Sequence, residues 1–224
     1  MELFVHDSPA DVAARTASLI AESIADKSGP FSLGLAGGSS PKPTYDRLRE
    51  IDVAWQGVHA WLGDERWVPH DSDRSNGRMA SDSLFSHVSA SLVRPDYGDD
   101  PEAAASAYEQ ELGEIEAMAG RHDIVILGLG DDGHTASLFP GSAALAESDR
   151  KYVANRIPET GEIRLTATYP LLHEAARVIF IVTGRSKAEA LEASLAGETP
   201  AGKVGQGRAT VEWHVDRDAA SLLS

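Results

Sequence analysis

Residues 128–141 carry the side chains best suited to acid–base chemistry. Their sequence is Gly-Leu-Gly-Asp-Asp-Gly-His-Thr-Ala-Ser-Leu-Phe-Pro-Gly, so one histidine, His134, follows two adjacent aspartates. A histidine titrates near ~6.5 and can therefore take and return a proton at neutral pH. The carboxylate of Asp132, or that of Asp131, could orient the ring or stabilise its charged form. We predict that His134 is a general base assisted by Asp132; a capping histidine without a catalytic role is the alternative.

The same residues open with the G-x-G-x-x-G pattern of dinucleotide-binding folds. However, Asp131 and Asp132 would place two negative charges where a pyrophosphate binds. Pro140 and Gly141 would also end any following helix within about two turns. The sequence therefore favours a catalytic loop that carries a histidine over a nucleotide site.

A second loop, Gly-Gly-Ser-Ser-Pro at residues 37–41, lies between an expected strand and an expected helix. Small residues allow the backbone to approach a ligand, and the N–H groups at the start of a helix would face it. We therefore predict a phosphate cradle formed by Gly37, Gly38 and Ser39. The loop lacks the lysine and the spacing of a P-loop, so ATP binding is not expected. A turn in which Ser39 or Ser40 caps the helix is equally compatible with these residues.

Two further loops place basic residues after expected strands. The first of them is Gly-Asp-Glu-Arg-Trp at residues 63–67, in which Arg66 could bind an anion through two N–H groups of its guanidinium group. A local ion pair of Arg66 with Asp64 or Glu65 is the alternative. In Thr-Gly-Arg-Ser-Lys, residues 183–187, Lys187 or Arg185 could meet a phosphate from the opposite side, with simple helix capping as the alternative. These loops are candidates for binding a negatively charged substrate.

The elements that must position these loops alternate along the chain. Short apolar runs predict strands at residues 3–5, 31–36, 58–62, 123–129, 177–182 and 211–215. Amphipathic or capped segments predict helices at residues 9–26, 41–50, 75–85 and 101–119, a further helix from about 185 and a short terminal helix from 216. Residues 63–74 are expected to form a polar loop.

This alternation predicts an α/β fold with a mostly parallel sheet covered on both faces. Such sheets bind ligands at the carboxyl ends of their strands, and the loops described above lie at such ends. With no internal repeat and no convincing linker, residues 1–224 are expected to form one domain.

Composition excludes several classes of function. The formal net charge is −15, so we expect neither nucleic acid nor an anionic lipid surface as a partner. The chain has no cysteine, its remaining histidines lack metal-ligand spacing, and no G-x-S-x-G motif is present; we therefore expect no disulfide, no metal site and no serine nucleophile. No signal-peptide pattern or long apolar run occurs, so a cytoplasmic location without membrane association is expected.

Together these segments resemble the 6-phosphogluconolactonase family, over nearly the whole chain and in the right order. The matching motifs are at residues 37–41, 64–69, 74–76, 128–141, 164–166, 183–184 and 187–188. The hallmark is Asp-Gly-His-Thr-Ala-Ser-Leu-Phe-Pro at residues 132–140.

The resemblance implies a three-layer, Rossmann-like α/β fold shared with sugar-phosphate isomerases and glucosamine-6-phosphate deaminases. It also implies hydrolysis of 6-phosphogluconolactone in the oxidative pentose phosphate pathway, without a cofactor. We expect the protein to be a monomer or weak homo-oligomer. By the same resemblance His134 activates the hydrolytic water, Arg66 and Lys187 hold the substrate phosphate, and Asp64, Arg164 and the glycine loop also contribute to substrate binding.

Two alternatives remain open. A deaminase–isomerase enzyme shares the fold and an Asp-Gly-His loop, but in that branch the histidine is typically followed by a different run that ends in an acidic residue, whereas Thr-Ala-Ser-Leu-Phe stands here at residues 135–139. A non-catalytic sugar-phosphate sensor would bind ligand with the same cradle and basic residues. Such a sensor needs an output element, and the sequence has no helix-turn-helix signal or basic segment.

Overall fold

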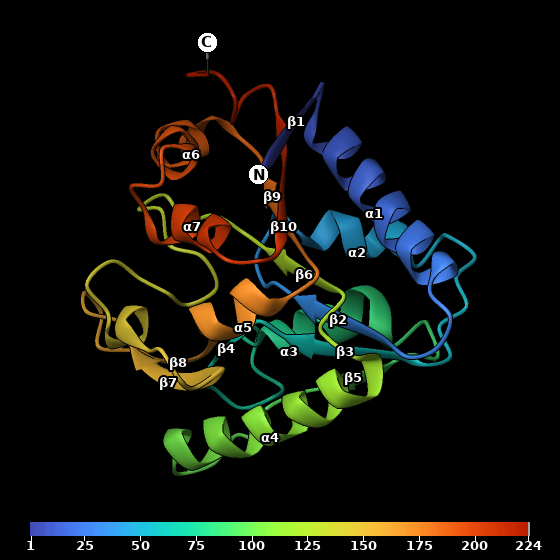
Figure 1. Cartoon of the computed structure of the whole chain (residues 1–224), viewed down its shortest axis with the longest axis vertical. Helices are drawn as coiled ribbons and strands as arrows, with labels where there is room; N and C mark the ends of the chain where they lie inside the picture. Colours follow the sequence, from blue (N-terminus) through green and yellow to red (C-terminus); the bar gives the residue numbers. More distant parts are fainter. Residues whose placement is uncertain (224) are drawn as a thin grey trace.

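The computed structural model describes residues 1–223, and its centre is a sheet of seven parallel strands (Figure 1). The order across the sheet is β1-β10-β9-β6-β2-β3-β5. These strands are β1 (Glu2–His6), β2 (Phe31–Leu35), β3 (Val58–Leu62), β5 (Ser91–Val93), β6 (Ile124–Leu127), β9 (Arg177–Val182) and β10 (Thr210–Asp216). The predicted α/β fold with a mostly parallel sheet is therefore confirmed.

Helices cover both faces of this sheet and give the three layers. One face packs against α1 (Pro9–Asp26), α2 (Lys42–Leu48) and α3 (Asn76–Ala80), which continues as the π-helical turn η1 (Ser81–Phe85). The other face packs against α4 (Pro101–Ala119), α5 (Tyr169–Glu174), α6 (Ala188–Leu195) and α7 (Pro200–Lys203). Short 3-10 turns are η2 (Ala143–Ala146), η3 (Arg185–Lys187) and η4 (Val204–Gln206).

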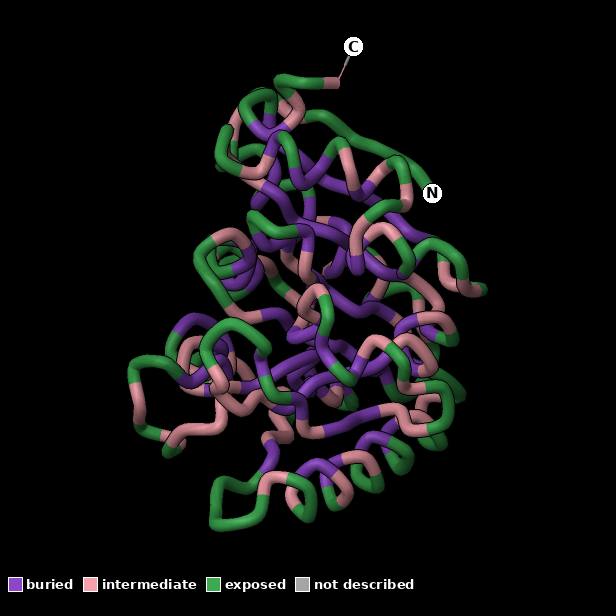
Figure 2. Tube along the Cα trace, turned by 90° about the vertical axis from the view of Figure 1, so that its left-hand side faces the viewer, coloured by how far each residue is buried: buried purple, intermediate pink, exposed green. Residues whose placement is uncertain are grey.

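The apolar runs form central strands because both of their faces are buried, as the trace coloured by burial shows (Figure 2). In β6, Ile124 and Ile126 belong to the core under α1–α3, whereas Val125 and Leu127 belong to the core under α4–α7. Successive side chains of a strand point to opposite faces, so a strand between two helical layers needs an unbroken apolar run.

A second sheet, which the sequence did not predict, stands beside the carboxyl ends of the main strands. It is antiparallel, in the order β4-β8-β7, and consists of β4 (Asp64–Arg66), β8 (Ile163–Ala167) and β7 (Tyr152–Arg156). Residues 63–74 are therefore not entirely a polar loop. The strand β4 has only charged residues and thus lacks the apolar alternation by which a strand is recognised.

Burial of β4 becomes possible through hydrogen bonds to distant residues. Glu65, 5% exposed, accepts hydrogen bonds from the Ser75 hydroxyl and from the backbone N–H groups of Asn76 and Gly77 at the start of α3. A buried carboxylate that is satisfied in this way can occupy the core edge.

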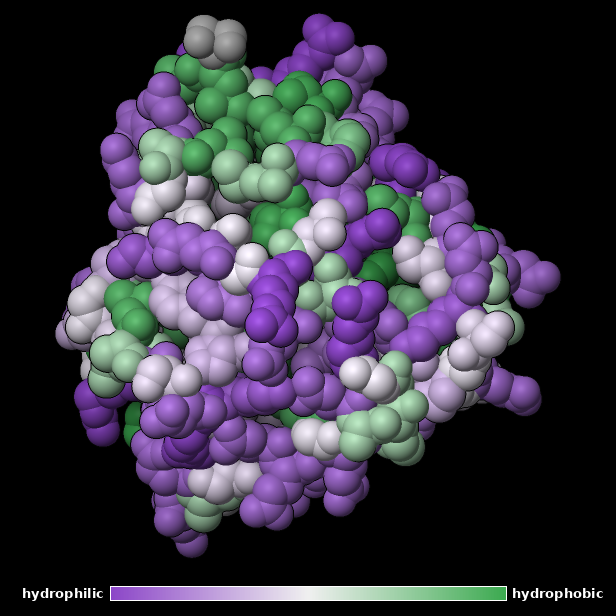
Figure 3. Space-filling view, in the orientation of Figure 1, coloured by the Kyte–Doolittle hydropathy of each residue, from purple (hydrophilic) through white to green (hydrophobic). Residues whose placement is uncertain are grey.

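The short terminal helix predicted from residue 216 is wrong, because residues 217–222 form turns. Asp216 is 1% exposed and accepts hydrogen bonds from the N–H groups of Gly184 and Ala219, so it ties the chain to the loop after β9. Most of the surface in Figure 3 is hydrophilic, whereas apolar residues gather near the C-terminal end. No helix within residues 1–223 is long and apolar enough to cross a membrane.

Candidate active site

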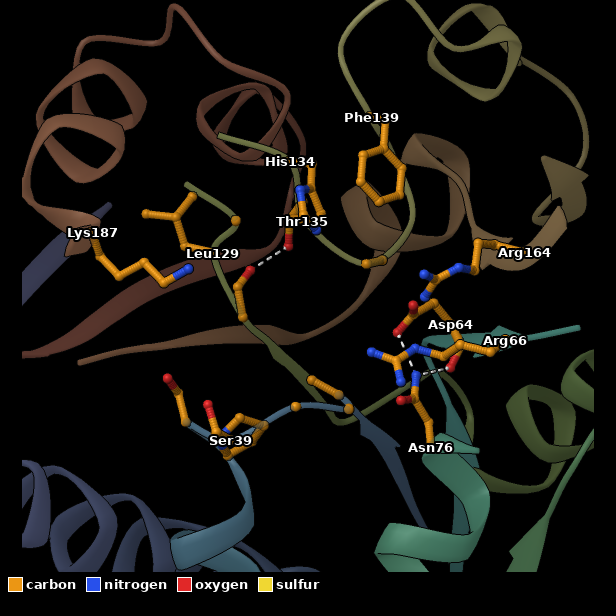
Figure 4. A pocket seen from close by; sticks show the side chains of 18 residues that line it. Ser39, Asp64, Arg66, Asn76, Leu129, His134, Thr135, Phe139, Arg164 and Lys187 are labelled. Atoms are coloured by element: carbon orange, nitrogen blue, oxygen red, sulfur yellow. Dashed lines mark hydrogen bonds between the residues drawn. The ribbon is translucent and has the colours of Figure 1, made fainter. Parts of the chain in front are cut away.

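A pocket of about 380 Å³ opens at the carboxyl ends of the central strands (Figure 4). Its wall consists of the loop after β2, the loop after β6, parts of β4 and β8, the start of α3 and η3. The structure brings eight of the nine predicted site residues together in its lining: Gly37, Gly38, Ser39, Asp64, Arg66, His134, Arg164 and Lys187. The ninth, Asp132, does not line the pocket but contacts His134.

His134 is held by a carboxylate on one side and by an aromatic ring on the other. Its Nδ1 lies 2.6 Å from Oδ1 of Asp132, and the same oxygen accepts a hydrogen bond from the backbone N–H of His134 at 3.1 Å. The imidazole stacks on Phe139, with 4.0 Å between ring centroids. Because Nδ1 is engaged, Nε2 is the nitrogen left to accept a proton from a molecule in the pocket.

Glycine at position 130 makes this arrangement possible. A Cβ atom at Gly130 would lie 2.0 Å from Nδ1 of His134 and 2.7 Å from Oδ1 of Asp132. Such distances are impossible for real atoms, so any side chain at this position would displace the His134–Asp132 pair.

The contacts of Asp132 favour its charged form. Partial burial acts to raise the pKa of Asp132, but the hydrogen bond from the backbone N–H of His134, together with the charge and the ring hydrogen bond of that histidine, outweighs it and leaves the pKa below its usual value. Asp132 is therefore a carboxylate at neutral pH and can stabilise the protonated form of His134.

Arg66 and Arg164 face the pocket together from the small sheet (Figure 4). Arg66 donates from Nη1 to the carbonyl oxygen of Arg74 at 2.7 Å, and Arg164 donates from Nη2 to Glu162 at 3.0 Å. In both guanidinium groups the Nε atom is buried without a hydrogen-bond partner. The alternative of a local ion pair between Arg66 and its neighbours in β4 is not what the structure has, and both arginines keep donors for a ligand.

Lys187 enters the pocket from the side opposite the two arginines (Figure 4). Its Nζ lies 2.6 Å from Oδ1 of Asp131, whose side chain is 71% exposed. Arg185, which the sequence left as an alternative, does not line the pocket. An ion pair of such an exposed carboxylate is weak, so Lys187 can exchange Asp131 for an anionic ligand.

The glycine loop approaches the pocket because two of its residues have no side chain. A Cβ atom at Gly37 would lie 1.9 Å from Oδ1 of Asn76, and Gly38 has a φ of +99°. The capping alternative is wrong: Pro41 occupies the N-cap position of α2 without a side-chain hydrogen bond, and the Ser40 hydroxyl lies 3.0 Å from that of Thr183. Ser39 lines the pocket instead.

Asp64 is placed in the lining, but its carboxylate is already occupied. The residue is 7% exposed; Oδ1 accepts from Nδ2 of Asn76 at 3.1 Å, and Oδ2 accepts from the hydroxyl of Ser137 at 2.8 Å. Sequence reasoning assigned no role to Asn76 or Phe139, although both lie in quoted motifs. The available signal for Asn76 was its place at the start of a helix beside a charged strand. The signal for Phe139 was an aromatic residue five positions after the histidine.

The pocket offers acid–base and anion-binding chemistry. Three cationic side chains and one histidine converge on it, and no group of three or more potential metal ligands occurs among residues 1–223. Such a set can position an anionic substrate and move a proton at one of its atoms.

Comparison with known proteins gives consistent matches over most of the chain. Residues 7–213 match the family model described as glucosamine-6-phosphate isomerases/6-phosphogluconolactonase. A 6-phosphogluconolactonase from Synechocystis is 37% identical over 217 residues, which cover 91% of this chain and 89% of that protein.

Solved structures show the same relationship. A 6-phosphogluconolactonase from Trypanosoma brucei superposes with a TM-score of 0.88 at 30% identity, covering 100% of this chain and 98% of that one. A monomeric glucosamine-6-phosphate deaminase superposes with a TM-score of 0.86 at 26% identity, covering 99% and 100%. The chain therefore belongs to the glucosamine-6-phosphate isomerase/6-phosphogluconolactonase family.

Proposed function

We propose that this protein hydrolyses 6-phospho-D-glucono-1,5-lactone to 6-phospho-D-gluconate. The observation that carries the proposal is the His134–Asp132 pair, which borders a pocket whose other walls present Arg66, Arg164 and Lys187. The 6-phosphogluconolactonases among the similar proteins support the same reaction.

His134 acts first as a base and then as an acid in this reaction. Its Nε2 takes a proton from a water molecule while the water oxygen attacks C1 of the lactone, and the carbonyl electrons move to the carbonyl oxygen. When the tetrahedral intermediate collapses, the bond between C1 and the ring oxygen breaks and His134 returns the proton to that oxygen. Asp132 stabilises the imidazolium between the two steps.

The phosphate of the substrate binds to the cationic side chains. Arg66 and Arg164 hold it from the small sheet and Lys187 contacts it from the opposite side, because a dianion needs local positive charge in a chain with a net charge of −15. Anchoring the phosphate several bonds from C1 uses binding energy to orient the carbonyl toward His134. The glycine loop supplies backbone N–H groups beside the same ligand.

The test is hydrolysis of freshly generated 6-phosphogluconolactone at constant pH by the wild type and by His134→Ala. We expect the wild type to exceed the spontaneous rate and the variant to fall to it. A wild-type rate equal to the spontaneous rate would refute the function. Full activity of the variant would refute the role of His134 alone.

Deamination of glucosamine 6-phosphate is the second candidate, since the similar structures include a deaminase. The run that follows the histidine, residues 135–139, ends here in Phe139, which stacks on His134, and not in an acidic residue; this favours the lactonase. Release of ammonia from glucosamine 6-phosphate, measured beside lactone hydrolysis, decides between them. We further propose that the enzyme works as one cytoplasmic catalytic domain in the oxidative pentose phosphate pathway, as a monomer or weak homo-oligomer.

A further inference from the structure

Ser137, three residues after His134, is held by hydrogen bonds at all of its polar groups. Its hydroxyl donates to Oδ2 of Asp64 at 2.8 Å, its backbone N–H donates to Oγ1 of Thr166 at 3.0 Å, and its carbonyl oxygen accepts from Nδ2 of Asn155 at 2.8 Å. A residue with this set of bonds is fixed in position and in orientation.

These four residues form a buried cluster. Ser137 and Thr166 are fully buried, Asn155 is 2% exposed and Asp64 is 7% exposed. Because a buried polar group that loses its partner keeps its desolvation cost, each bond in the cluster resists opening.

The partners of Ser137 come from all three strands of the small sheet. Asp64 lies in β4, Asn155 in β7 and Thr166 in β8, whereas Ser137 belongs to the loop after β6 of the main sheet. The small sheet therefore acts as a rigid support to which the catalytic loop is attached at one residue.

The segment between Ser137 and His134 has little freedom. Thr135 donates from its hydroxyl to the carbonyl oxygen of Gly128 at 2.8 Å, and Ala136 has a φ of +48°. Within residues 1–223, Ala136 is the one residue other than glycine with a positive φ. Such a conformation costs about 1 kcal/mol or more and persists only where neighbouring contacts impose it. Ser137, the next residue, makes three such contacts.

Asp64 connects the same anchor to the anion-binding side of the pocket. Its carboxylate also accepts from Nδ2 of Asn76, whose amide lies against Gly37, and Arg66 follows two residues later in β4. One buried carboxylate thus sets the distance between the loop that carries His134 and the strand that carries Arg66.

We infer that Ser137 is a positioning residue, which fastens the catalytic loop to Asp64, Asn155 and Thr166 and thereby places His134 opposite the anion-binding arginines. This inference rests on the proposed function, because its kinetic consequence is a loss of lactone hydrolysis. Since one misplaced ångström at a reacting centre costs about a hundredfold in rate, the role can be measured.

The first test compares Ser137→Ala with Ser32→Ala. Ser32 is also fully buried, and its hydroxyl makes two hydrogen bonds, with His122 and Trp61, away from the pocket. The same chemical change therefore removes at least as many hydrogen bonds in the control as in Ser137→Ala, which loses one. We expect kcat of Ser137→Ala to fall about tenfold to a hundredfold, with KM within about threefold of the wild type. Ser32→Ala should keep the wild-type kcat. Equal kcat values for both variants would overturn the inference.

A second readout needs no substrate. The ring of His134 stacks on Phe139, so its Cε1–H resonance carries a ring-current shift that reports the position of the loop. That resonance, assigned by its loss in His134→Ala, should move in Ser137→Ala and stay in Ser32→Ala; an unmoved resonance in Ser137→Ala contradicts the positioning role. A wild type without lactonase activity would refute the proposed function. The comparison of the His134 resonance in the two variants would still show whether Ser137 positions the loop.

Two variants of Thr166 test the inference even if Ser137→Ala does not fold. Thr166→Val keeps the shape but removes the acceptor for the N–H of Ser137, and Thr166→Ser retains that acceptor. We expect Thr166→Val to lower kcat and to move the His134 resonance, and Thr166→Ser to restore both. Equal behaviour of the two variants would count against the inference.

Discussion

Arg66 and Arg164 are direct partners in the antiparallel pairing of β4 with β8, and both face the same pocket. Like charges opposite each other in a sheet oppose pairing, and each guanidinium group also has a buried Nε atom without a partner. We expect an anion bound between the two guanidinium groups to reduce their repulsion, so that occupation of the pocket by a negatively charged ligand stabilises the small sheet.

Replacing Arg164 by alanine should weaken substrate binding more than turnover. A hydrogen bond to a charged group is worth about 1.5–3 kcal/mol, which corresponds to an increase in KM of about tenfold to a hundredfold. Steady-state kinetics on the lactone measure this. Arg156→Ala is the control, since Arg156 is exposed and bonds to the carbonyl oxygen of Gly161 outside the pocket. An unchanged KM in Arg164→Ala would contradict the phosphate-binding role.

Replacing Asp132 by asparagine should lower kcat at pH 7 by about tenfold to a hundredfold, with little change in KM, because the imidazolium loses its counter-charge. The pKa of Asp132 is below its usual value, so its stabilising contribution is present above that usual value, ~3.9, and is lost as the pH falls through the lowered value. Asp132 is therefore charged at pH 7, where the assay is made. Wild-type kcat in Asp132→Asn would exclude the assisting role.

Replacing Gly130 by alanine should lower kcat at least as far as Asp132→Asn, because the added Cβ would occupy the space of Nδ1 of His134. Gly113 in α4 is the matched control: a Cβ there meets nothing within 4 Å, so Gly113→Ala should raise the free energy of unfolding by about 1 kcal/mol and leave kcat unchanged. Measured kcat and thermal unfolding of both variants test the prediction. It fails if Gly130→Ala is fully active.

Acid should destabilise the protein through His122. Burial lowers the pKa of His122 to about 4, whereas the unfolded chain binds the proton near ~6.5. The unfolded state therefore binds more protons in that interval, and the free energy of unfolding falls as the pH drops from about 6.5 to about 4. His122→Gln should show a shallower decrease of Tm over this range, and the exposed His87→Gln should follow the wild type. Parallel curves for all three proteins would contradict the assignment.

The central strands of the main sheet were predictable because they are apolar on both faces, whereas the short, partly exposed edge strand β5 was not predicted. Because Ile124–Leu127 is buried between two helical layers, all four of its residues are apolar, and this run can be recognised in the sequence. The ends of α4 were predicted equally well, because Asp100 caps its first turn and Gly120, with a φ of +83°, ends the helix. The loops with Gly37 and His134 then followed from the rule that parallel strands present ligand sites at their carboxyl ends.

The small sheet was not predictable because its burial depends on partners far along the chain. Asp64 is buried through Asn76 and Ser137, 12 and 73 residues away. No local pattern carries such information. For the same reason Arg164 could be suggested as a site residue only by family resemblance: its place opposite Arg66 follows from strand pairing.

The position of β1 at one edge of the main sheet delays the closing of that edge. Within residues 1–223, β1 pairs only with β10, which lies between β1 and β9 in the sheet. The strand β1 therefore cannot dock before β10, about two hundred residues later in the sequence, has formed, and this long sequence separation makes its docking slow. All residues between β1 and β10 must be synthesised before this edge of the sheet can close.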